Sequence, residues 1–352
     1  TVTSDRFALN ASGSEATFSG ISGGTNVVIS ATLLKNGIQS KLKQYNRSQE
    51  LVVNLSKFSE SGTNDSSSIN DGLTYNRYYG LRVQDEEISL NYPDVSEVLA
   101  VYESLDSADP TLDTIQCNAT ADVSNNAIIG ENIIGETSKA VCRVVSSPLT
   151  NQLRIVYLNT DRLIAGEPIT FYESNIKTEI EAITLGNYKN ITPTFTLDKG
   201  QKDQFYDYSR LVRKGSSSIP ARRLLVVFDH YTVPTDTGDV FTVLSYDKDR
   251  FSNDIPEIGT NRVRATDTLD FRPRVSYFSG SSSSPFDFTS RDFDTVPKLL
   301  LAPNESSLLG YDYYLGRIDR LYLDKFGGFI LEKGVSEITP KPPTNNDEVM
   351  TV

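Results

Sequence analysis

The sequence predicts an all-β protein, built from several small β-sandwich or β-barrel-like domains in a row with few short helices. Short apolar stretches recur along the chain, and clusters of Pro, Gly, Asn and Asp separate them at the spacing typical of sandwiches. Long amphipathic helices are not predicted; the best short candidate is residues 174–183, which Ser174 can cap. The longest uninterrupted apolar run, residues 224–228, is too short for a helix and predicts a strand buried on both faces.

Turn-rich stretches divide the chain into four predicted domains. Residues 1–85 are expected to form a β-sandwich-like domain, and residues 86–195 a small β-barrel-like domain. Residues 196–278 are expected to form a β-sandwich domain, and residues 279–352 a flexible linker, a closing β-hairpin and a polar tail. The strands predicted in these domains lie, in order, at 27–34, 51–55, 75–83, 88–90, 95–102, 139–145, 153–158, 223–231, 240–245, 263–265, 313–323 and 328–333.

A short internal similarity lies inside the second predicted domain. Gly-Glu-Asn-Ile at residues 130–133 and Gly-Glu-Pro-Ile at residues 166–169 each place Gly-Glu at a turn before an apolar strand residue. Glycine turns at strand corners are one way in which a curled sheet closes. The pair therefore indicates a small closed barrel or a curled sheet, with chance as the alternative explanation for so short a match.

Composition restricts the classes of partner. The chain has 46 acidic and 34 basic residues among 352, a formal net charge of -12, so nucleic acid is not expected as a partner. No apolar run approaches the roughly 20 residues of a membrane span, and the first residues do not resemble a signal peptide. A chain of this length can bury a large core, so its folding does not require a disulfide bond. Cys117 and Cys142 are therefore expected to form either one disulfide or two buried thiols.

Catalytic chemistry has little support in the residue types. His230 is the single histidine, so a Ser-His-Asp triad or a typical zinc site would depend on it; we expect a hydrogen-bonded residue at a strand end instead. Clustered acidic residues keep calcium binding and glycoside hydrolysis open, although turn formation and pairing with arginine are their expected roles. We therefore expect no enzyme activity, no cofactor and no metal ion. The acidic clusters are Asp203 and Asp207; Asp247, Asp249 and Asp254; and Asp267 and Asp270.

Arginine residues stand beside acidic and aromatic residues in three segments. A planar guanidinium can bridge a carboxylate through two hydrogen bonds and stack on a ring, which suits locking between strands or between subunits. We therefore predict a structural or interface role for these groups, and expect Asp203, Asp207 and Arg210 to make hydrogen bonds or ion pairs within the third domain. The candidate residues are Asp203, Tyr206, Asp207, Arg210, Arg272, Arg274, Arg317 and Asp319.

Three segments in the second half of the chain form a recognisable series. They are GQKDQFYD at residues 200–207, DFRPR at residues 270–274 and YLGRID at residues 314–319. In this order they resemble signatures of the large virion structural proteins of T4-like cyanophages and related marine phages with contractile tails. The resemblance covers the C-terminal half well, whereas the N-terminal 195 residues are similar only in their β-rich style.

The resemblance implies a virion structural protein of the tail baseplate or tail-fibre region that acts by protein–protein assembly. Its implied partners are other virion tail or baseplate proteins and copies of itself, and its implied location is the virion tail, after synthesis in the host cytoplasm. The family offers no catalytic residue to carry over. The alternative is a receptor-binding or glycan-binding tail adhesin, since exposed Tyr and Asn can bind host surface glycans. A carbohydrate-active enzyme is the less favoured alternative.

Overall fold

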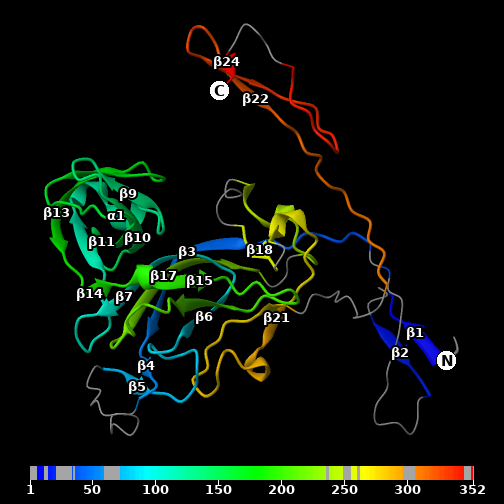
Figure 1. Ribbon diagram of the computed structural model, residues 1–352, viewed down its shortest axis with the longest axis horizontal. Coiled ribbons are helices and arrows are strands. Elements are labelled where there is room, and N and C mark those ends of the chain that lie inside the picture. Colours follow the sequence, from blue (N-terminus) through cyan, green and yellow to red (C-terminus); the bar gives the residue numbers. More distant parts are fainter. Residues whose placement is uncertain are drawn as a thin grey trace. The chain divides into compact units, whose positions relative to one another are not determined.

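The computed structural model describes residues 6–11, 15–20, 34, 36–58, 72–234, 238–248, 255–259, 262–295, 306–344 and 350–351. These residues form many strands and one four-residue α-helix, α1 (Val123–Asn126), which confirms the all-β prediction. The chain divides into two compact units, Thr1–Leu300 and Leu301–Val352, which are described separately (Figure 1). Within these described ranges, none of the helices has the length and apolar character needed to cross a membrane.

A four-stranded antiparallel sheet, in the order β14-β7-β17-β3, lies at the centre of the first unit. β17 lies between β7 and β3, and each of its residues except Thr232 is buried. The prediction of a strand buried on both faces at residues 224–228 is therefore confirmed. The strands of this sheet are β14 (Tyr188–Asn190), β7 (Val95–Ser104), β17 (Leu224–Thr232) and β3 (Gln44–Val53).

A second antiparallel sheet, in the order β15-β16-β6, packs on one face of the first and completes a β-sandwich. Because side chains alternate along a strand, Leu224, Val226 and Phe228 of β17 face this second sheet. Its strands are β15 (Phe195–Asp198), β16 (Tyr208–Arg213) and β6 (Glu87–Pro93). The sandwich core comprises Val53, Leu73, Val83, Ile88, Leu90, Val95, Val101, Ile191, Phe195, Leu211, Leu224, Val226 and Phe228.

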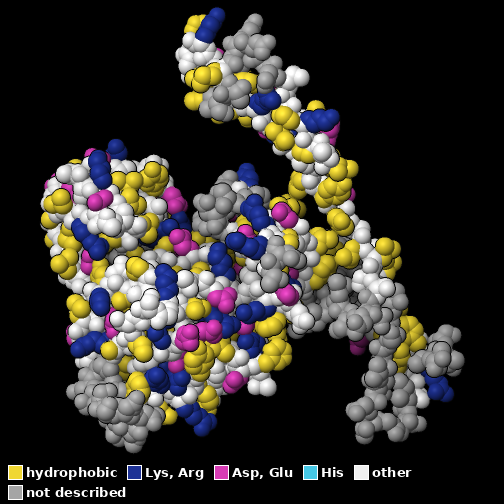
Figure 2. Space-filling model, in the orientation of Figure 1, with side chains coloured by type: hydrophobic (Ala, Val, Ile, Leu, Met, Phe, Trp, Pro, Cys, Tyr) yellow, Lys and Arg dark blue, Asp and Glu magenta, His cyan; other side chains and the backbone are white. Residues whose placement is uncertain are grey.

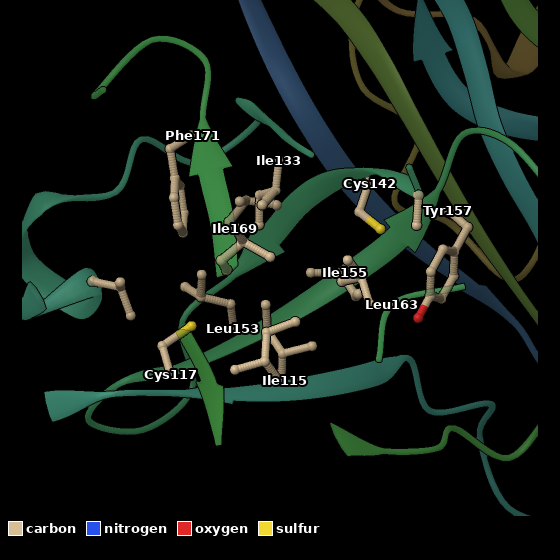
Figure 3. Packing of buried hydrophobic residues seen from close by; sticks show 14 residues of the cluster. Ile115, Cys117, Ile133, Cys142, Leu153, Ile155, Tyr157, Leu163, Ile169 and Phe171 are labelled. Carbon is tan, nitrogen blue, oxygen red and sulfur yellow. The ribbon is translucent and has the colours of Figure 1, made fainter. Parts of the chain in front are cut away.

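A closed six-stranded barrel is inserted between β7 and β14, with the order β10-β11-β8-β13-β12-β9. Inward-facing side chains such as Ile115, Ile155 and Ile169 fill its interior (Figure 3). Cys117 and Cys142 lie in this core as free thiols, and burial raises the pKa of Cys117 to about 12. The barrel strands are β8 (Asp113–Cys117), β9 (Asn132–Gly135), β10 (Val141–Ser146), β11 (Gln152–Tyr157), β12 (Pro168–Phe171) and β13 (Lys177–Thr184).

The barrel consists of two halves, β8-β9-β10 and β11-β12-β13, whose strands pair in an equivalent pattern. β8 pairs with β11 and β9 pairs with β12, while β10 pairs with β11 as β13 pairs with β8. The two Gly-Glu turns before β9 and β12 are equivalent, and Gly130 and Gly166 have similar φ angles of 84° and 86°. The internal similarity is thus a structural repeat, and of the two predicted forms, a closed barrel or a curled sheet, the closed barrel is present.

Each half of the barrel caps a turn of the other half with a buried glutamate. Glu131 accepts hydrogen bonds of 2.9 Å from both the backbone N–H and the hydroxyl of Ser174, in the turn between β12 and β13. Glu167 accepts the equivalent bonds, of 2.9 and 2.8 Å, from Ser138 in the turn between β9 and β10. Each carboxylate also accepts the N–H of the residue three positions before it. The two halves are therefore held together reciprocally.

The barrel packs on the face of the first sheet opposite to the sandwich core. Val145 and Val156 on the outside of the barrel form one buried cluster with Leu225 and Val227 of β17. β17 is consequently covered by the second sheet on one face and by the barrel on the other. Ion pairs join the barrel to the sheet: Arg154 with Glu50 through two hydrogen bonds of 2.8 Å, and Arg143 with Asp229 at 3.1 Å.

The predicted division into consecutive domains is wrong for the first unit. β3, from the predicted domain 1–85, pairs along its length with β17, from the predicted domain 196–278. β6 and β7, from the predicted domain 86–195, belong to the two sheets of the same sandwich. Strand pairing between segments distant in sequence therefore builds one sandwich, and the barrel is an insertion within it.

The predicted domain boundary before residue 279 is also wrong. The Ser284 hydroxyl donates a hydrogen bond of 2.7 Å to the Tyr79 carbonyl, and the Asn76 side-chain amide donates one of 2.9 Å to the Ser281 carbonyl. These contacts attach the serine-rich segment to the turns after β5 (Thr74–Tyr75), so it belongs to the first unit, with the sandwich.

The helix predicted at residues 174–183 is instead the turn before β13 and most of β13 itself. Ile176, Ile180 and Ile183 have helical spacing, yet all three pack in the barrel core. A register shift between Ile180 and Ala182 explains this, because a bulge adds one residue and changes which later side chains face inward. The bulged strand therefore imitates the apolar period of a helix.

Other local predictions differ in smaller ways. The strand predicted at 240–245 is instead two isolated bridges, at Val240 and Phe241, followed by a 3-10 helix, Val243–Ser245. Of the strand predicted at 75–83, only Tyr75 in β5 and an isolated bridge at Arg82 are present. The strand predicted at 27–34 lies outside the described residues except for Leu34. The remaining short strands of this unit pair as β1 (Phe7–Leu9) with β2 (Ala16–Phe18), β4 (Leu55–Ser56) with β5 (Thr74–Tyr75), β18 (Glu257–Ile258) with β19 (Val263–Arg264), and β20 (Arg274–Val275) with β21 (Phe293–Thr295).

The described residues of the second unit, 306–344 and 350–351, form one small antiparallel sheet, in the order β23-β22-β24. The Asp324 carboxylate accepts hydrogen bonds from the N–H groups of Phe326 and Gly328, at 2.8 and 2.7 Å, and so shapes the turn between β22 and β23. The predicted closing hairpin is confirmed, although its first strand, expected over residues 313–323, covers only Arg320–Leu323. The strands are β22 (Arg320–Leu323), β23 (Phe329–Glu332) and β24 (Met350–Thr351).

We expect Glu131→Ala and Glu167→Ala each to lower the free energy of unfolding of the first unit by about 2–4 kcal/mol, because buried N–H groups lose their acceptor. The two losses should be similar, since the residues are equivalent. Urea unfolding followed by circular dichroism measures both, with Glu181→Ala on the exposed side of β13 as the control. Losses no larger than that of the control would contradict the reciprocal capping.

Candidate functional site

The two signature segments in the first unit, residues 200–207 and 270–274, lie side by side. The Tyr206 N–H donates to the Pro273 carbonyl at 2.8 Å, and the Val275 N–H donates to the Tyr206 carbonyl at 3.0 Å. Two parts of the chain that are far apart in sequence, and that both carry the resemblance, therefore form one structural feature next to the sandwich.

Buried charged and polar side chains meet at this feature in what we call the Lys43 network: Lys43, Asp94, Tyr206, Tyr246, Asp270 and Arg272. Lys43 stands directly before β3, and its side chain is fully buried. Its Nζ atom donates to the Asp94 carboxylate at 2.6 Å and to the Tyr246 hydroxyl at 2.9 Å. Asp94 forms the corner between β6 and β7, where its φ of 61° allows the chain to turn sharply.

Aromatic rings surround the Lys43 ammonium group. Its Nζ atom lies 4.6 Å from the ring centroid of Tyr206, 4.7 Å from that of Tyr246 and 4.8 Å from that of Phe241. Tyr231 of β17 contributes a fourth ring at 5.6 Å. The negative faces of these rings attract a cation, most strongly where water is excluded. The site is thus an aromatic cage that the chain fills with its own lysine.

Arg272 and Asp270 form the second half of the Lys43 network. The guanidinium donates through Nε to one carboxylate oxygen at 2.9 Å and through Nη2 to the other at 2.7 Å, which is the bidentate geometry. The Cζ atom of Arg272 lies over the Tyr206 ring, 4.2 Å from its centroid, and the Tyr206 hydroxyl donates a hydrogen bond to Asp270. Gln201 bridges the two halves, accepting from Arg272 at 2.9 Å and donating to Asp94 at 3.2 Å.

The environment of the Lys43 network changes the acidity of its groups. Burial lowers the pKa of Lys43, although the neighbouring Asp94 carboxylate opposes the shift. Burial raises the pKa of Tyr206 well above its ordinary value, and nearby carboxylates add to the effect. Burial alone would raise the pKa of Asp270, but hydrogen bonds from Arg272 and Tyr206 outweigh it and hold that pKa below the ordinary value.

A second cluster, the Asp207 clamp, comprises Asp207, Arg210 and Arg291. Arg291 donates to the two carboxylate oxygens of buried Asp207 at 2.7 and 2.8 Å, and Arg210 adds a third hydrogen bond at 3.1 Å. Gly200 makes room for this turn, since a Cβ atom added to it would lie 2.3 Å from the Asp207 carbonyl oxygen. The clamp therefore ties the start of β16 to the segment around residue 291.

The remaining sequence candidates lie in different surroundings. We expected hydrogen bonds or ion pairs from Asp203, Asp207 and Arg210. Those of Asp207 and Arg210 are observed, whereas Asp203 is exposed and belongs to neither cluster. Arg274 is buried and donates to the Tyr231 carbonyl at 2.7 Å. Arg317 and Asp319 belong to the second unit, where they form a local pair two residues apart, with hydrogen bonds of 2.7 and 3.0 Å.

The other acidic clusters of the sequence analysis do not gather into a site that the structure describes. Asp247 and Asp267 are exposed, while Asp249 and Asp254 lie outside the described residues. Among the residues that are described, there is no group of three or more His, Cys, Asp or Glu side chains that could hold a metal ion.

Sequence reasoning missed four members of the two clusters: Lys43, Asp94, Tyr246 and Arg291. Asp94 had a usable signal, because Pro-Asp stands between two strand patterns and so marks a strand corner. No sequence signal pointed to Lys43, Tyr246 or Arg291. Lysine and arginine side chains are mostly exposed, and only the fold buries Lys43 and Arg291 here.

His230 is a core residue of β17, close to its C-terminal end. It is 3% exposed, and its ring centroid lies 4.6 Å from that of Tyr92 and 5.8 Å from that of Phe228. The strand-end position agrees with the prediction, but its Nδ1 atom has no hydrogen-bond partner within the described part of the chain. Burial lowers the pKa of His230 to about 4, with help from the nearby charge of Arg274.

No protein-family model, curated protein or solved structure matches this chain.

We expect Arg272→Lys to lower the free energy of unfolding of the first unit by about 2–3 kcal/mol, because lysine can neither form the bidentate bonds to Asp270 nor stack on Tyr206. Arg262→Lys is the matched control, since Arg262 pairs with Glu257 at 2.6 Å but its side chain is 77% exposed. Chemical denaturation measures both variants. Equal stability of the two would show that the buried pair contributes nothing beyond a surface pair.

Acid sensitivity is expected from His230. Its folded pKa lies below its ordinary value, so the unfolded chain binds the proton more readily between these values, and stability falls as the pH is lowered from about 6.5 to about 4. The full loss is up to about 3 kcal/mol. His230→Phe keeps an aromatic ring but does not titrate, so its unfolding free energy should change less over this window. Parallel pH profiles for the variant and the parent chain would contradict this assignment.

Proposed function

We propose that this chain is a structural protein of a phage virion, in the baseplate or tail-fibre region of the tail, and that it acts through protein–protein assembly. The observation that carries the proposal is that the two segments of the first unit that resemble the virion family, 200–207 and 270–274, pack together. They supply Tyr206, Asp270 and Arg272 to a buried network. In this arrangement the signature residues hold parts of the chain in place.

The two clusters suit a mechanical role. The Lys43 network joins the residue before β3, the corner between β6 and β7 and both signature segments, and the Asp207 clamp adds the region of Arg291. Removing one partner of such a buried charged set leaves the other charge uncompensated, which costs about 3–5 kcal/mol. Segments held in this way resist separation, as a protein that transmits force in a contractile tail requires.

The second unit supports an assembly role in a different way. Hydrophobic side chains are exposed along much of this unit (Figure 2). Protein surfaces of this kind commonly mark sites of interaction with other proteins. The most exposed of these residues are Leu308, Tyr314, Phe326, Phe329, Val335 and Ile338, each at least 68% exposed.

A tail adhesin is the second candidate, and one observation favours it. Tyr311, Tyr313 and Tyr314 are 63%, 65% and 78% exposed within four residues of sequence. Exposed aromatic faces of this kind can stack on sugar rings. A glycan array separates the two candidates, since an adhesin should bind a defined host glycan and lose the binding when these tyrosines are changed to serine.

Purified virions test the proposed function. We expect mass spectrometry to find this chain in particles of the phage that encodes it, and antibody labelling in electron microscopy to place it on the tail. Absence of the chain from purified particles, or its presence only in infected-cell lysate, would refute the virion role. A known capsid protein from the same particles serves as the control for recovery.

A further inference from the structure

Lys43 and Asp94 form a buried pair whose amine and carboxyl groups are in direct contact. The Lys43 Nζ atom lies 2.6 Å from Asp94 Oδ2, and the two side chains are 0% and 2% exposed. The pair of Lys202 and Asp198 differs in both respects, since its charged atoms are 3.7 Å apart and its side chains are 41% and 39% exposed. Two charges that do not reach water carry a large desolvation cost. The surroundings of the buried pair therefore disfavour its charged form.

These surroundings exclude water and promote the neutral amine. Tyr206, Tyr231 and Phe241, each at most 2% exposed, place their rings around Nζ. Burial lowers the pKa of Lys43, so the ammonium can pass a proton to the adjacent carboxylate and become a neutral amine. A lysine that apolar surroundings deprotonate is a nucleophile. The carboxyl group of Asp94, which it contacts, contains a carbon that an amine can attack.

We propose that Lys43 and Asp94 react with each other to form an amide bond between Nζ and Cγ, so that the chain contains an internal covalent cross-link. This inference does not depend on the proposed function, because it follows from the contacts of the pair. The reaction needs no co-reactant, since an ammonium and a carboxylate together contain every atom of one amide and one water molecule. Its net charge does not change.

Neighbouring side chains are placed to assist the reaction. Nζ also donates to the hydroxyls of Tyr246 at 2.9 Å and Tyr206 at 3.5 Å, and these bonds hold the amine beside the carboxyl group. Gln201 donates a hydrogen bond of 3.2 Å to Asp94 Oδ1, the oxygen that becomes negative when the amine lone pair attacks Cγ. Two protons pass from Nζ to Oδ2 along their 2.6 Å hydrogen bond. The Cγ–Oδ2 bond then breaks, Oδ2 leaves as water, and the carbonyl re-forms on Oδ1.

The cross-link joins two places that strand pairing does not join directly. Lys43 precedes β3, Asp94 lies between β6 and β7, and β17 separates β3 from β7 in the sheet. Residues 44–93 thereby become part of a closed covalent loop. A force applied to the two ends of the chain bypasses this loop and cannot extend it.

The mass of the intact, denatured full chain tests the cross-link. We expect it to be about 18 Da below the mass calculated from the sequence, because one water molecule is lost. Digestion with trypsin should yield a species that joins residues 42–47 to residues 83–139, and its fragmentation should place the bond between Lys43 and Asp94. Such a species distinguishes the amide from a cyclic imide at a single aspartate, which also loses one water molecule.

Two variants complete the test. Lys43→Arg should have its full calculated mass, because a guanidinium keeps the charge but is not a nucleophile. Lys202→Arg is the matched control and should keep the deficit, since Lys202 belongs to the exposed pair. The parent chain is decisive by itself, so poor folding of a variant cannot produce the expected result. A parent chain of full mass, a deficit that persists in Lys43→Arg, or a deficit confined to one peptide would each overturn the inference.

Discussion

The burial of β17 on both faces is the constraint on which the first unit depends. One row of its side chains contacts the second sheet, and the other contacts the outside of the barrel. Full burial of a side chain such as Leu225 or Val227 stabilises the fold by about 1.5–3 kcal/mol relative to exposure. The barrel is therefore needed as the third layer over a sheet whose central strand has no polar face. This requirement explains why an inserted domain is attached through apolar packing and ion pairs as well as through its two connections.

Buried charged groups define the geometry around these apolar layers. In the barrel, Glu131 and Glu167 each bind a turn that belongs to the other half, so neither half is complete alone. Beside the sandwich, Lys43 and Arg272 hold together segments that are not joined by strand pairing. Apolar contacts are not directional, whereas a buried charge is stable only with its partners in place. The charged groups thus select one arrangement among the many that apolar packing alone would permit.

The errors of the sequence analysis have physical causes that particular elements show. The spacing of Ile176, Ile180 and Ile183 predicts a helix, but all three pack at the barrel core, because a bulge in β13 after Ile180 turns Ile183 to the same face as the other two. The division into consecutive domains failed because β3 and β17 are distant in sequence and adjacent in the sheet. Strand pairing depends on contacts between distant segments, and local patterns contain little information about which segments will meet.

Local spacing and turn chemistry were enough to predict the class of the fold, the doubly buried strand at 224–228 and the β22–β23 hairpin, and to indicate the Gly-Glu repeat of the barrel. It also identified Tyr206, Asp207, Arg210 and Arg272 as structural groups, since arginine, carboxylate and ring stood close in sequence. The partners of these residues could not be predicted, because they come from distant parts of the chain. Lys43, Asp94 and Arg291 reach these residues from other strands and loops, and burial gives a lysine or an arginine a role that its exposed form would not have.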